Sequence, residues 1–279
     1  MNPYRGAVMT LLTMHGKERA VGPALVESLG ATLRIVDDVD TDKLGTFTRD
    51  IPRSGTQREA AFLKVALAAE RNPFGLGLGS EGTFLPGPLG LGSWNVEMLA
   101  FVDRGRGIEI LGRAAGPGRH HHAAVESRDA LEAFARRSGF PEHGLVLRPA
   151  QADDPRILKG LKNWEDLGAA FEEVRKAAPD RKVFVEHDLR AHMHPTRMAL
   201  VGEATRDLVV RLLRLCPACG TPGYGVERKV PGLVCAWCHA PTSEPRAEEY
   251  ACVACPHREI KAISGPKAAD PGRCSRCNP

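Results

Sequence analysis

The stretch Ala7-Val-Met-Thr-Leu-Leu-Thr-Met14 is a short apolar run, and His15-Gly16-Lys17 follows it directly. An apolar run of this length is typical of a buried β-strand. Residues 21–29 carry apolar side chains at helical spacing, Gly30 is well placed to end that helix, and residues 31–36 have the composition of a second strand. This opening therefore predicts a β-α-β unit at the start of an α/β domain.

The first two thirds of the chain continue with the same alternation. The pattern predicts further strands over residues 74–78, 96–102, 108–111, 145–147 and 182–186, and helices over residues 56–70, 127–137, 196–215 and from Asn163 onward. Alternating strands and helices favour a sheet that is covered by helices on both faces. We therefore expect a three-layer α/β domain with a mixed central sheet.

All cysteines of the chain lie beyond residue 215. They form four Cys-x-x-Cys pairs: Cys216/Cys219, Cys235/Cys238, Cys252/Cys255 and Cys274/Cys277. Fifteen residues separate the first two pairs and eighteen separate the last two, which is the spacing of zinc ribbons. Zn²⁺ takes four thiolates in a tetrahedron, so these ligands predict two structural zinc ions, each held by four cysteines. The simplest pairing is sequential, first with second and third with fourth, and a crossed pairing remains open.

The cysteines also set the expected domain boundaries. We expect the α/β domain to span residues 1–195, a connecting helix to span 196–215, and a small C-terminal double zinc-ribbon domain to span 216–279. Each ribbon is too small to bury a core of its own. Metal binding should therefore contribute much of its folding free energy, on the order of 10 kcal/mol per site.

Composition narrows the class of protein. A disulfide framework is the alternative for so many cysteines, but residues 1–20 are interrupted by charges and lack the apolar core of a secretory signal. Reduced cysteines without a signal predict a cytoplasmic protein.

We expect no membrane span, because no run of about 18 apolar residues exists. The net charge of +4 is small for a dedicated nucleic-acid binder.

The turn after the first predicted strand is a candidate phosphate site. It carries Thr13, His15 and Lys17, which supply a hydroxyl, an imidazole and an ammonium group. Backbone N–H groups at the start of a helix can hold an anion together with such side chains. The same residues also fit an ordinary strand–helix turn with a solvated lysine, so both interpretations stay open here.

Charged side chains in two later segments are candidate catalytic residues. Glu59 and Lys64 lie five positions apart on the predicted helix over 56–70, so they do not stack as an i,i+4 pair, and a solvated helix edge is the alternative. Glu81 follows the predicted strand over 74–78, in the place where α/β sheets put ligand groups. An exposed strand end is the alternative for Glu81.

Two arginines near the start of the longest predicted helix are further candidates for phosphate binding. Arg190 and Arg197 carry guanidinium groups, which suit a phosphate or a carboxylate. Structural pairing with Asp188 or Glu186 is the alternative for both.

Three of these motifs together resemble a known superfamily. Thr-x-His-Gly-Lys at 13–17, Gly-Thr-x-x-Glu-Ala-Ala-x-x-Lys at 55–64 and the strand that leads into Gly-x-Glu-Gly at 79–82 are similar to the inosine/xanthosine triphosphate pyrophosphatases. That superfamily includes the Maf-like and Ham-like house-cleaning nucleotidases. The resemblance covers residues 8–110. It implies a nucleotidase-like α/β domain in which Lys17 and Lys64 contact phosphate.

The same resemblance implies a role for each acidic residue. Glu59 would bind Mg²⁺, and Glu81 would be a magnesium ligand or the general base. Over nearly its whole length, the chain also resembles an uncharacterised bacterial family with a zinc-ribbon tail. The shared motifs of that family include Asp40–Thr48, Ser80–Phe84 and Arg190–Met198. No established function comes with this second resemblance.

The motifs leave three functions open. The first is a Mg²⁺-dependent hydrolase similar to nucleoside triphosphate pyrophosphatases, with a zinc-binding tail. The second is a catalytically silent module that senses a nucleotide and uses its structural zinc to bind nucleic acid or protein. The third is an interaction protein with structural zinc and no small ligand. We expect a nucleotide or another phosphorylated small molecule as the partner of the α/β domain, and a nucleic acid or a protein as the partner of the tail.

Overall fold

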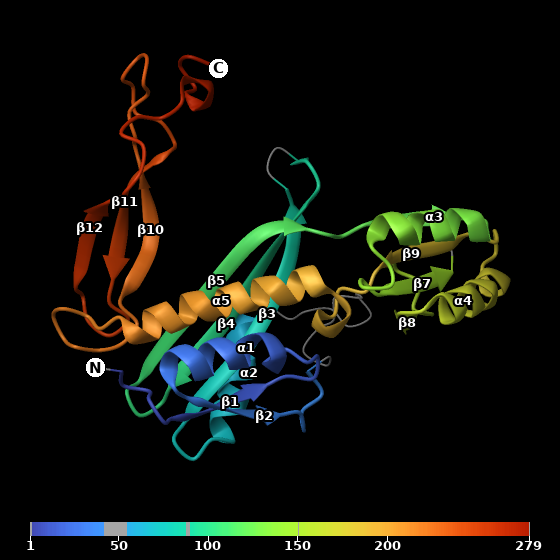
Figure 1. Ribbon diagram of the computed structural model, residues 1–279, viewed down its shortest axis with the longest axis horizontal. Helices are drawn as coiled ribbons and strands as arrows, with labels where there is room; N and C mark the ends of the chain where they lie inside the picture. Colours follow the sequence, from blue (N-terminus) through green and yellow to red (C-terminus); the bar gives the residue numbers. More distant parts are fainter. Residues whose placement is uncertain (1, 42–54, 88–89, 150, 279) are drawn as a thin grey trace. The chain divides into compact units, whose positions relative to one another are not determined.

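The structure is a computed structural model of the chain (Figure 1). It describes residues 2–41, 55–87, 90–149 and 151–278, so most of the Asp40–Thr48 motif lies outside the described residues. The chain divides into two compact units. The α/β unit comprises Tyr4–Arg106 and Leu111–Val209, and the tail unit comprises Met1–Pro3, Gly107–Ile110 and Val210–Pro279.

A five-stranded sheet forms the centre of the α/β unit. Its strands are β1 (Val8–Leu12), β2 (Thr32–Val36), β3 (Leu76–Pro86), β4 (Ser93–Asp103) and β5 (Ile108–Gly118), in the order β2-β1-β3-β4-β5. β1 is parallel to both β2 and β3, whereas β3 and β4 are antiparallel. The expected mixed sheet is therefore confirmed. β3 is longer than expected, because it continues through its glycines as far as Pro86.

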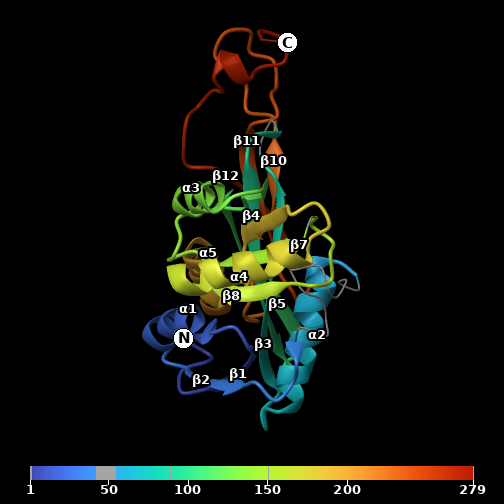
Figure 2. The same ribbon diagram turned by 90° about the vertical axis from the view of Figure 1, so that its right-hand side faces the viewer.

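Helices cover both faces of this sheet. They are α1 (Glu18–Ala24), a π-helical turn (Leu25–Leu29), α2 (Gln57–Glu70) and α5 (Pro195–Leu213). A Cβ on Gly77 or Gly79 of β3 would clash with the backbone of α2, and a Cβ on Gly112 of β5 would clash with α5. Figure 2 shows α1 and α2 on opposite sides of the strands. This arrangement is the expected three-layer architecture.

Local sequence explains where these helices begin and end. Thr56 accepts a hydrogen bond from the backbone N–H of Glu59, and the Glu59 carboxylate accepts one from the backbone N–H of Thr56, which is a capping box at the start of α2. Gly30 ends the first helical segment with a φ of 59°, a left-handed conformation that glycine adopts without strain. Pro23 lies inside α1, and the helix changes to its π-helical turn two residues later.

The α/β unit also contains a second sheet, which the sequence did not separate from the first. Its strands are β6 (His122–Val125), β7 (Leu145–Pro149), β8 (Leu158–Leu161) and β9 (Val183–His187), in the order β6-β9-β7-β8, and all its pairings are antiparallel. The helices α3 (Arg128–Ser138) and α4 (Trp164–Ala177) pack on it through a shared apolar core. A short 3₁₀ turn (Ala191–Met193) then leads from β9 into α5.

The tail unit is built on a three-stranded antiparallel sheet. Its strands are β10 (Gly225–Pro231), β11 (Pro245–Ala251) and β12 (Arg258–Ala262), with β11 in the middle, and a 3₁₀ turn (Pro271–Arg273) follows. Within the described part of the chain, no helix has both the length and the apolar character that crossing a membrane requires.

Candidate functional site

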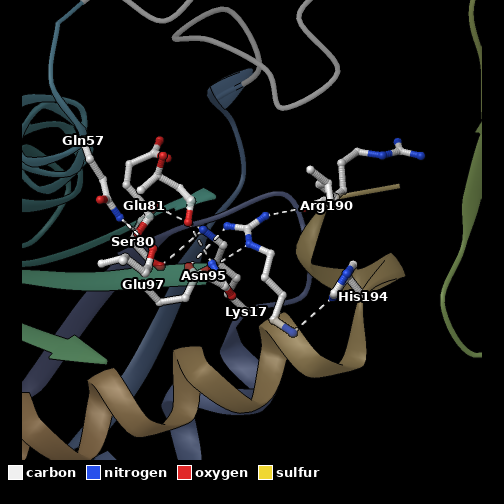
Figure 3. Close-up of polar contacts among 12 residues, drawn as sticks. Lys17, Gln57, Ser80, Glu81, Asn95, Glu97, Arg190 and His194 are labelled. Carbon is white, nitrogen blue, oxygen red and sulfur yellow. Dashed lines mark hydrogen bonds and ion pairs between the residues drawn. The ribbon is translucent and has the colours of Figure 1, made fainter. Parts of the chain in front are cut away.

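Five charged side chains gather in the interior of the α/β unit, at the end of strand β1 (Figure 3). They are Lys17, Lys64, Glu81, Glu97 and Arg197, and every one of them is buried. The register of the sheet places them there. Leu12, the last residue of β1, pairs with Gly79 of β3, so Glu81 lies just beyond the carboxyl end of β1. This edge is where ligands bind in open α/β sheets.

Lys17 comes from the turn between β1 and α1. Its ammonium group donates to the backbone carbonyl of Ser80 at 3.1 Å and to the Ser80 hydroxyl at 3.2 Å. Burial, and after it the positive charges of Arg197 and Lys64, lower the pKa of Lys17 to about 7, while the negative charges of Glu81 and Glu97 act in the opposite direction. The loss of hydration on burial therefore outweighs the attraction of the two carboxylates for the Lys17 ammonium group.

Lys64 and Glu81 form a buried ion pair on the α2 side of the sheet. The Lys64 Nζ lies 2.5 Å from Oε1 of Glu81. Successive side chains of a strand point to opposite faces, so Glu81 shares the face of Gly77 and Gly79, which α2 covers. The sequence predicted both residues as catalytic, and the structure brings them together.

Glu97 and Arg197 form a second buried ion pair on the other face. The Arg197 Nε lies 2.6 Å from Oε1 of Glu97, and the Arg197 guanidinium also donates to the backbone carbonyl of Leu189. Glu97 pairs with Gly82 across the β3–β4 ladder. A Cβ on Gly82 would lie 2.4 Å from a carboxylate oxygen of Glu97 and 2.5 Å from a nitrogen of Arg197. Glycine at 82 therefore makes room for this ion pair.

Asn95 adds an unsatisfied polar atom to this face. Its amide nitrogen donates to the backbone carbonyl of Thr83 and to Glu97, but its Oδ1 is buried and has no hydrogen-bond partner among the described residues. Buried polar oxygens without a partner are uncommon in folded proteins. Sequence reasoning missed both Asn95 and Glu97. The signal was present, because polar Asn95 and Glu97 alternate with apolar residues at the start of the strand predicted over residues 96–102.

Two other predicted site residues have structural roles. Glu59 is exposed and belongs to the capping box of α2, where its hydrogen bonds with Thr56 lower its pKa. Arg190 pairs with the buried Asp188, with 2.6 Å between the guanidinium and carboxylate atoms. The alternative of structural pairing is thus confirmed for Arg190, and Arg197 has Glu97 as its partner instead of Asp188 or Glu186.

The turn residues Thr13 and His15 lie beside a small cleft. The Thr13 hydroxyl accepts a weak hydrogen bond from the backbone N–H of His15 at 3.4 Å. Thr13, Gly16 and Asp37 line the cleft, which has a volume of ≈ 280 Å³ at the carboxyl ends of β1 and β2. An open hollow therefore adjoins the turn from which Lys17 enters the buried cluster.

The cysteines form two clusters in the tail unit. One contains Cys216, Cys219, Cys252 and Cys255, the other contains Cys235, Cys238, Cys274 and Cys277, and the sulfur atoms of each cluster lie within 4.8 Å of one another. Separations of 3.6 and 3.8 Å occur between sulfur atoms in both clusters. Four sulfurs at about 2.3 Å from one zinc ion would lie about 3.8 Å apart, so the two four-cysteine clusters fit two zinc ions.

Local hydrogen bonds favour the thiolate form that a metal ion needs. A hydrogen bond with the Thr221 hydroxyl is the main cause that lowers the pKa of Cys219 to about 6. The backbone N–H groups of Arg276 and Cys277 lower the pKa of Cys274 to about 7. Each cluster thus contains one thiol whose pKa is lowered, while contacts with the neighbouring cysteines and burial raise the pKa of another, Cys255 in one cluster and Cys277 in the other, to about 12.

The pairing of the cysteines is crossed, so the simplest expectation of sequential pairing is wrong. The tail sheet gives the reason. β10 lies between the first and second Cys pairs, and its extended backbone spans roughly 20 Å, which carries the second pair away from the first. β11 runs antiparallel to β10 and brings the third pair back to the first, since Gly225 pairs with Ala251. One cluster therefore forms at each end of the sheet.

Comparison with known proteins identifies a family without a known function. A family model described as Domain of unknown function (DUF6671) matches residues 64–279, which is more than half of the chain. No curated protein and no solved structure matches the chain, so no comparison supports the pyrophosphatase resemblance. The matched range includes Glu81, Glu97, Arg197 and all the cysteines. The chain therefore belongs to the DUF6671 family.

Proposed function

We propose that the α/β unit binds a nucleoside triphosphate or a related phosphorylated small molecule and hydrolyses it between the α and β phosphates. The observation that carries this proposal is the composition of the buried cluster. Its three cationic side chains, Lys17, Lys64 and Arg197, face two carboxylates, Glu81 and Glu97. A cleft at the carboxyl ends of β1 and β2 borders the turn that carries Lys17.

An anionic ligand would complete the charge balance of this cluster. Both carboxylates already have a cationic partner, whereas the hydrogen bonds of the Lys17 ammonium group go to Ser80. A buried charge without a counter-ion is costly, and a phosphate group beside Lys17 would remove that cost. The depressed pKa of Lys17, about 7, has burial and the nearby positive charges of Arg197 and Lys64 as its causes, and a bound anion would offset both.

Glu81 is the residue that we propose as the general base. A water molecule held by its carboxylate would attack the α phosphorus, its proton would pass to Glu81, and pyrophosphate would leave with the electron pair of the broken P–O bond. Lys64 keeps the Glu81 carboxylate in place. Lys17 would stabilise the charge that develops on the phosphate oxygens, which is the largest contribution in most phosphoryl-transfer sites.

The residues do not form an evident magnesium site. Glu59 and Glu81, the two expected ligands, differ in surroundings, since Glu59 is exposed in a capping box and Glu81 is buried against Lys64. Among the described residues, only the cysteines form groups of three or more metal-ligating side chains. Magnesium binding by Glu59 and Glu81 stays a prediction, and no step above depends on it.

The test is pyrophosphate and phosphate release from a panel of ordinary and deaminated nucleoside triphosphates. We expect pyrophosphate release by the zinc-loaded chain and a loss of about 10²–10⁴-fold in kcat for Glu81→Gln, which removes the base but keeps the shape. Glu132→Gln is the matched control, because Glu132 lies on the surface of α3. Unchanged release in Glu81→Gln would exclude Glu81 as the base. Binding without release would make the protein a nucleotide sensor, and neither binding nor release would overturn the proposal.

A further inference from the structure

A second hollow lies within the α/β unit, between α1 and the first turns of α5. Its volume is ≈ 600 Å³, which is in the range of sites for small organic ligands. Small and apolar residues make up most of its walls, namely Gly16, Ala20 and Pro23 on one side and Met198, Ala199 and Gly202 on the other. A flat, apolar molecule would fit between such walls.

This groove borders two of the segments that carry the buried cations. Gly16 lines both the groove and the smaller cleft, so both hollows border the turn that carries Lys17. On the opposite wall, Met198 follows directly after Arg197. A ligand that extends from the cleft into the groove would therefore place one end near the cationic cluster and the other between α1 and α5.

An aromatic surface lies at this junction. His192 lines the groove, and its ring stacks on the ring of His15, with 5.2 Å between the ring centroids and 19° between the ring planes. Burial, and after it the charge of His15, lowers the pKa of His192. A neutral imidazole offers a planar face on which another planar ring can stack.

Polar side chains at the rim of the groove can form hydrogen bonds with the edge of such a ring. Arg19, Glu203 and Arg206 line the groove and are exposed, so the rim offers both hydrogen-bond donors and a carboxylate acceptor. Heterocyclic bases carry donors and acceptors along their edges, and a few polar groups around an apolar slot are what gives such sites their specificity.

We infer that this groove holds the base and sugar of a nucleotide, with the base against His192, while the phosphates lie at the buried cations. The inference rests on the proposed function and deepens it, because it gives the nucleoside part of the ligand a binding site of its own. It also assigns recognition of the organic part of the ligand to α1 and α5.

The experiment compares two ligands that share phosphates and differ in the nucleoside. Calorimetric titration of the full, zinc-loaded chain would use inorganic tripolyphosphate and nucleoside triphosphates with a methylene bridge between the α and β phosphates, which cannot be cleaved there. We expect at least one nucleotide to bind tenfold or more tightly than tripolyphosphate. Ala199→Leu, which fills the groove from an exposed helical position, should abolish this advantage and leave tripolyphosphate affinity within twofold.

Two further variants complete the experiment. Ala133→Leu makes the same change on an exposed position of α3, away from the groove, and should alter neither affinity. His192→Ala should weaken nucleotide binding about fivefold, and His192→Phe should restore it, because the phenyl ring keeps the stacking surface. Equal affinity of the wild type for both ligands, or undiminished nucleotide binding by Ala199→Leu, would overturn the inference and leave phosphate binding intact. Failure of every phosphate compound to bind would overturn the proposed function as well.

Discussion

Arg197 and Glu97 are 100 positions apart in the chain, and their side chains form an ion pair that is almost completely shielded from solvent. Glu97 comes from β4 of the five-stranded sheet, and Arg197 comes from the first turn of α5. The same guanidinium donates to the carbonyl of Leu189, just after β9 of the second sheet. One side chain thus connects both sheets of the α/β unit.

The first prediction concerns this ion pair. Arg197→Met should lower the free energy of unfolding by about 3–5 kcal/mol, because it leaves the Glu97 carboxylate buried without a counter-ion. Arg156→Met is the control, since Arg156 pairs with Asp154 at the surface and should lose less than about 1 kcal/mol. Urea unfolding of the two variants at pH 7 measures the difference. Equal losses would show that the buried ion pair contributes no more to the free energy of unfolding than the surface pair does.

The second prediction concerns the pH dependence of stability. The pKa of Lys17 is lowered from 10.5 to about 7 in the folded protein. Between these two values the unfolded chain binds one more proton than the folded chain, so stability rises with pH, by up to about 1.4 kcal/mol per pH unit. Lys17→Met removes the titrating group and keeps the volume. Its stability should exceed that of the wild type most at pH 7, and the gap should close as the pH rises toward 10.

Urea unfolding of both proteins at pH 7, 8 and 9, without added phosphate, provides this comparison. Groups that do not interact with Lys17 titrate equally in the two proteins and cancel in the difference. Parallel stability profiles would show that Lys17 keeps its ordinary pKa in the folded protein.

The third prediction concerns Gly82. Gly82→Ala should destabilise the protein by about 1–3 kcal/mol, because the added Cβ would press into the Glu97–Arg197 pair, which is fixed from both sides. Gly265→Ala is the matched control, since a Cβ at 265 meets no atom within 4 Å. Thermal unfolding of both variants distinguishes them. A Gly82→Ala protein as stable as the control would mean that the ion pair can move aside.

The fourth prediction tests the crossed pairing of the cysteines. The wild type should bind two zinc ions per chain, and each single Cys→Ala variant should bind one. Cys216→Ala combined with Cys252→Ala should still bind one, because both residues belong to the same cluster, whereas Cys216→Ala combined with Cys235→Ala should bind none. Mass spectrometry of the metal content of each purified variant measures the number of zinc ions per chain. Sequential pairing would exchange the results of the two double variants.

Much of the secondary structure was predictable because its signals are local. Ser127 and Asn163 accept hydrogen bonds at the starts of α3 and α4 as predicted, and Gly139 ends α3 in a left-handed conformation. These positions depend on hydrogen bonds within a few residues, which the order of residue types specifies directly. The second sheet was not separated from the first because strand periodicity does not tell which strands will pair.

The sequence by itself determined the metal ligands and the classes of element, because a Cys-x-x-Cys pair or a capped helix is complete within a few residues. Only the tertiary structure decided which cysteine pairs share a cluster, since an extended strand such as β10 moves the second pair away from the first. The tertiary structure likewise gave Arg197 its partner Glu97 and placed Glu59 outside the buried cluster. Such contacts depend on strand order and register, which arise from the packing of the whole sheet. No fixed spacing of residues in the sequence specifies them.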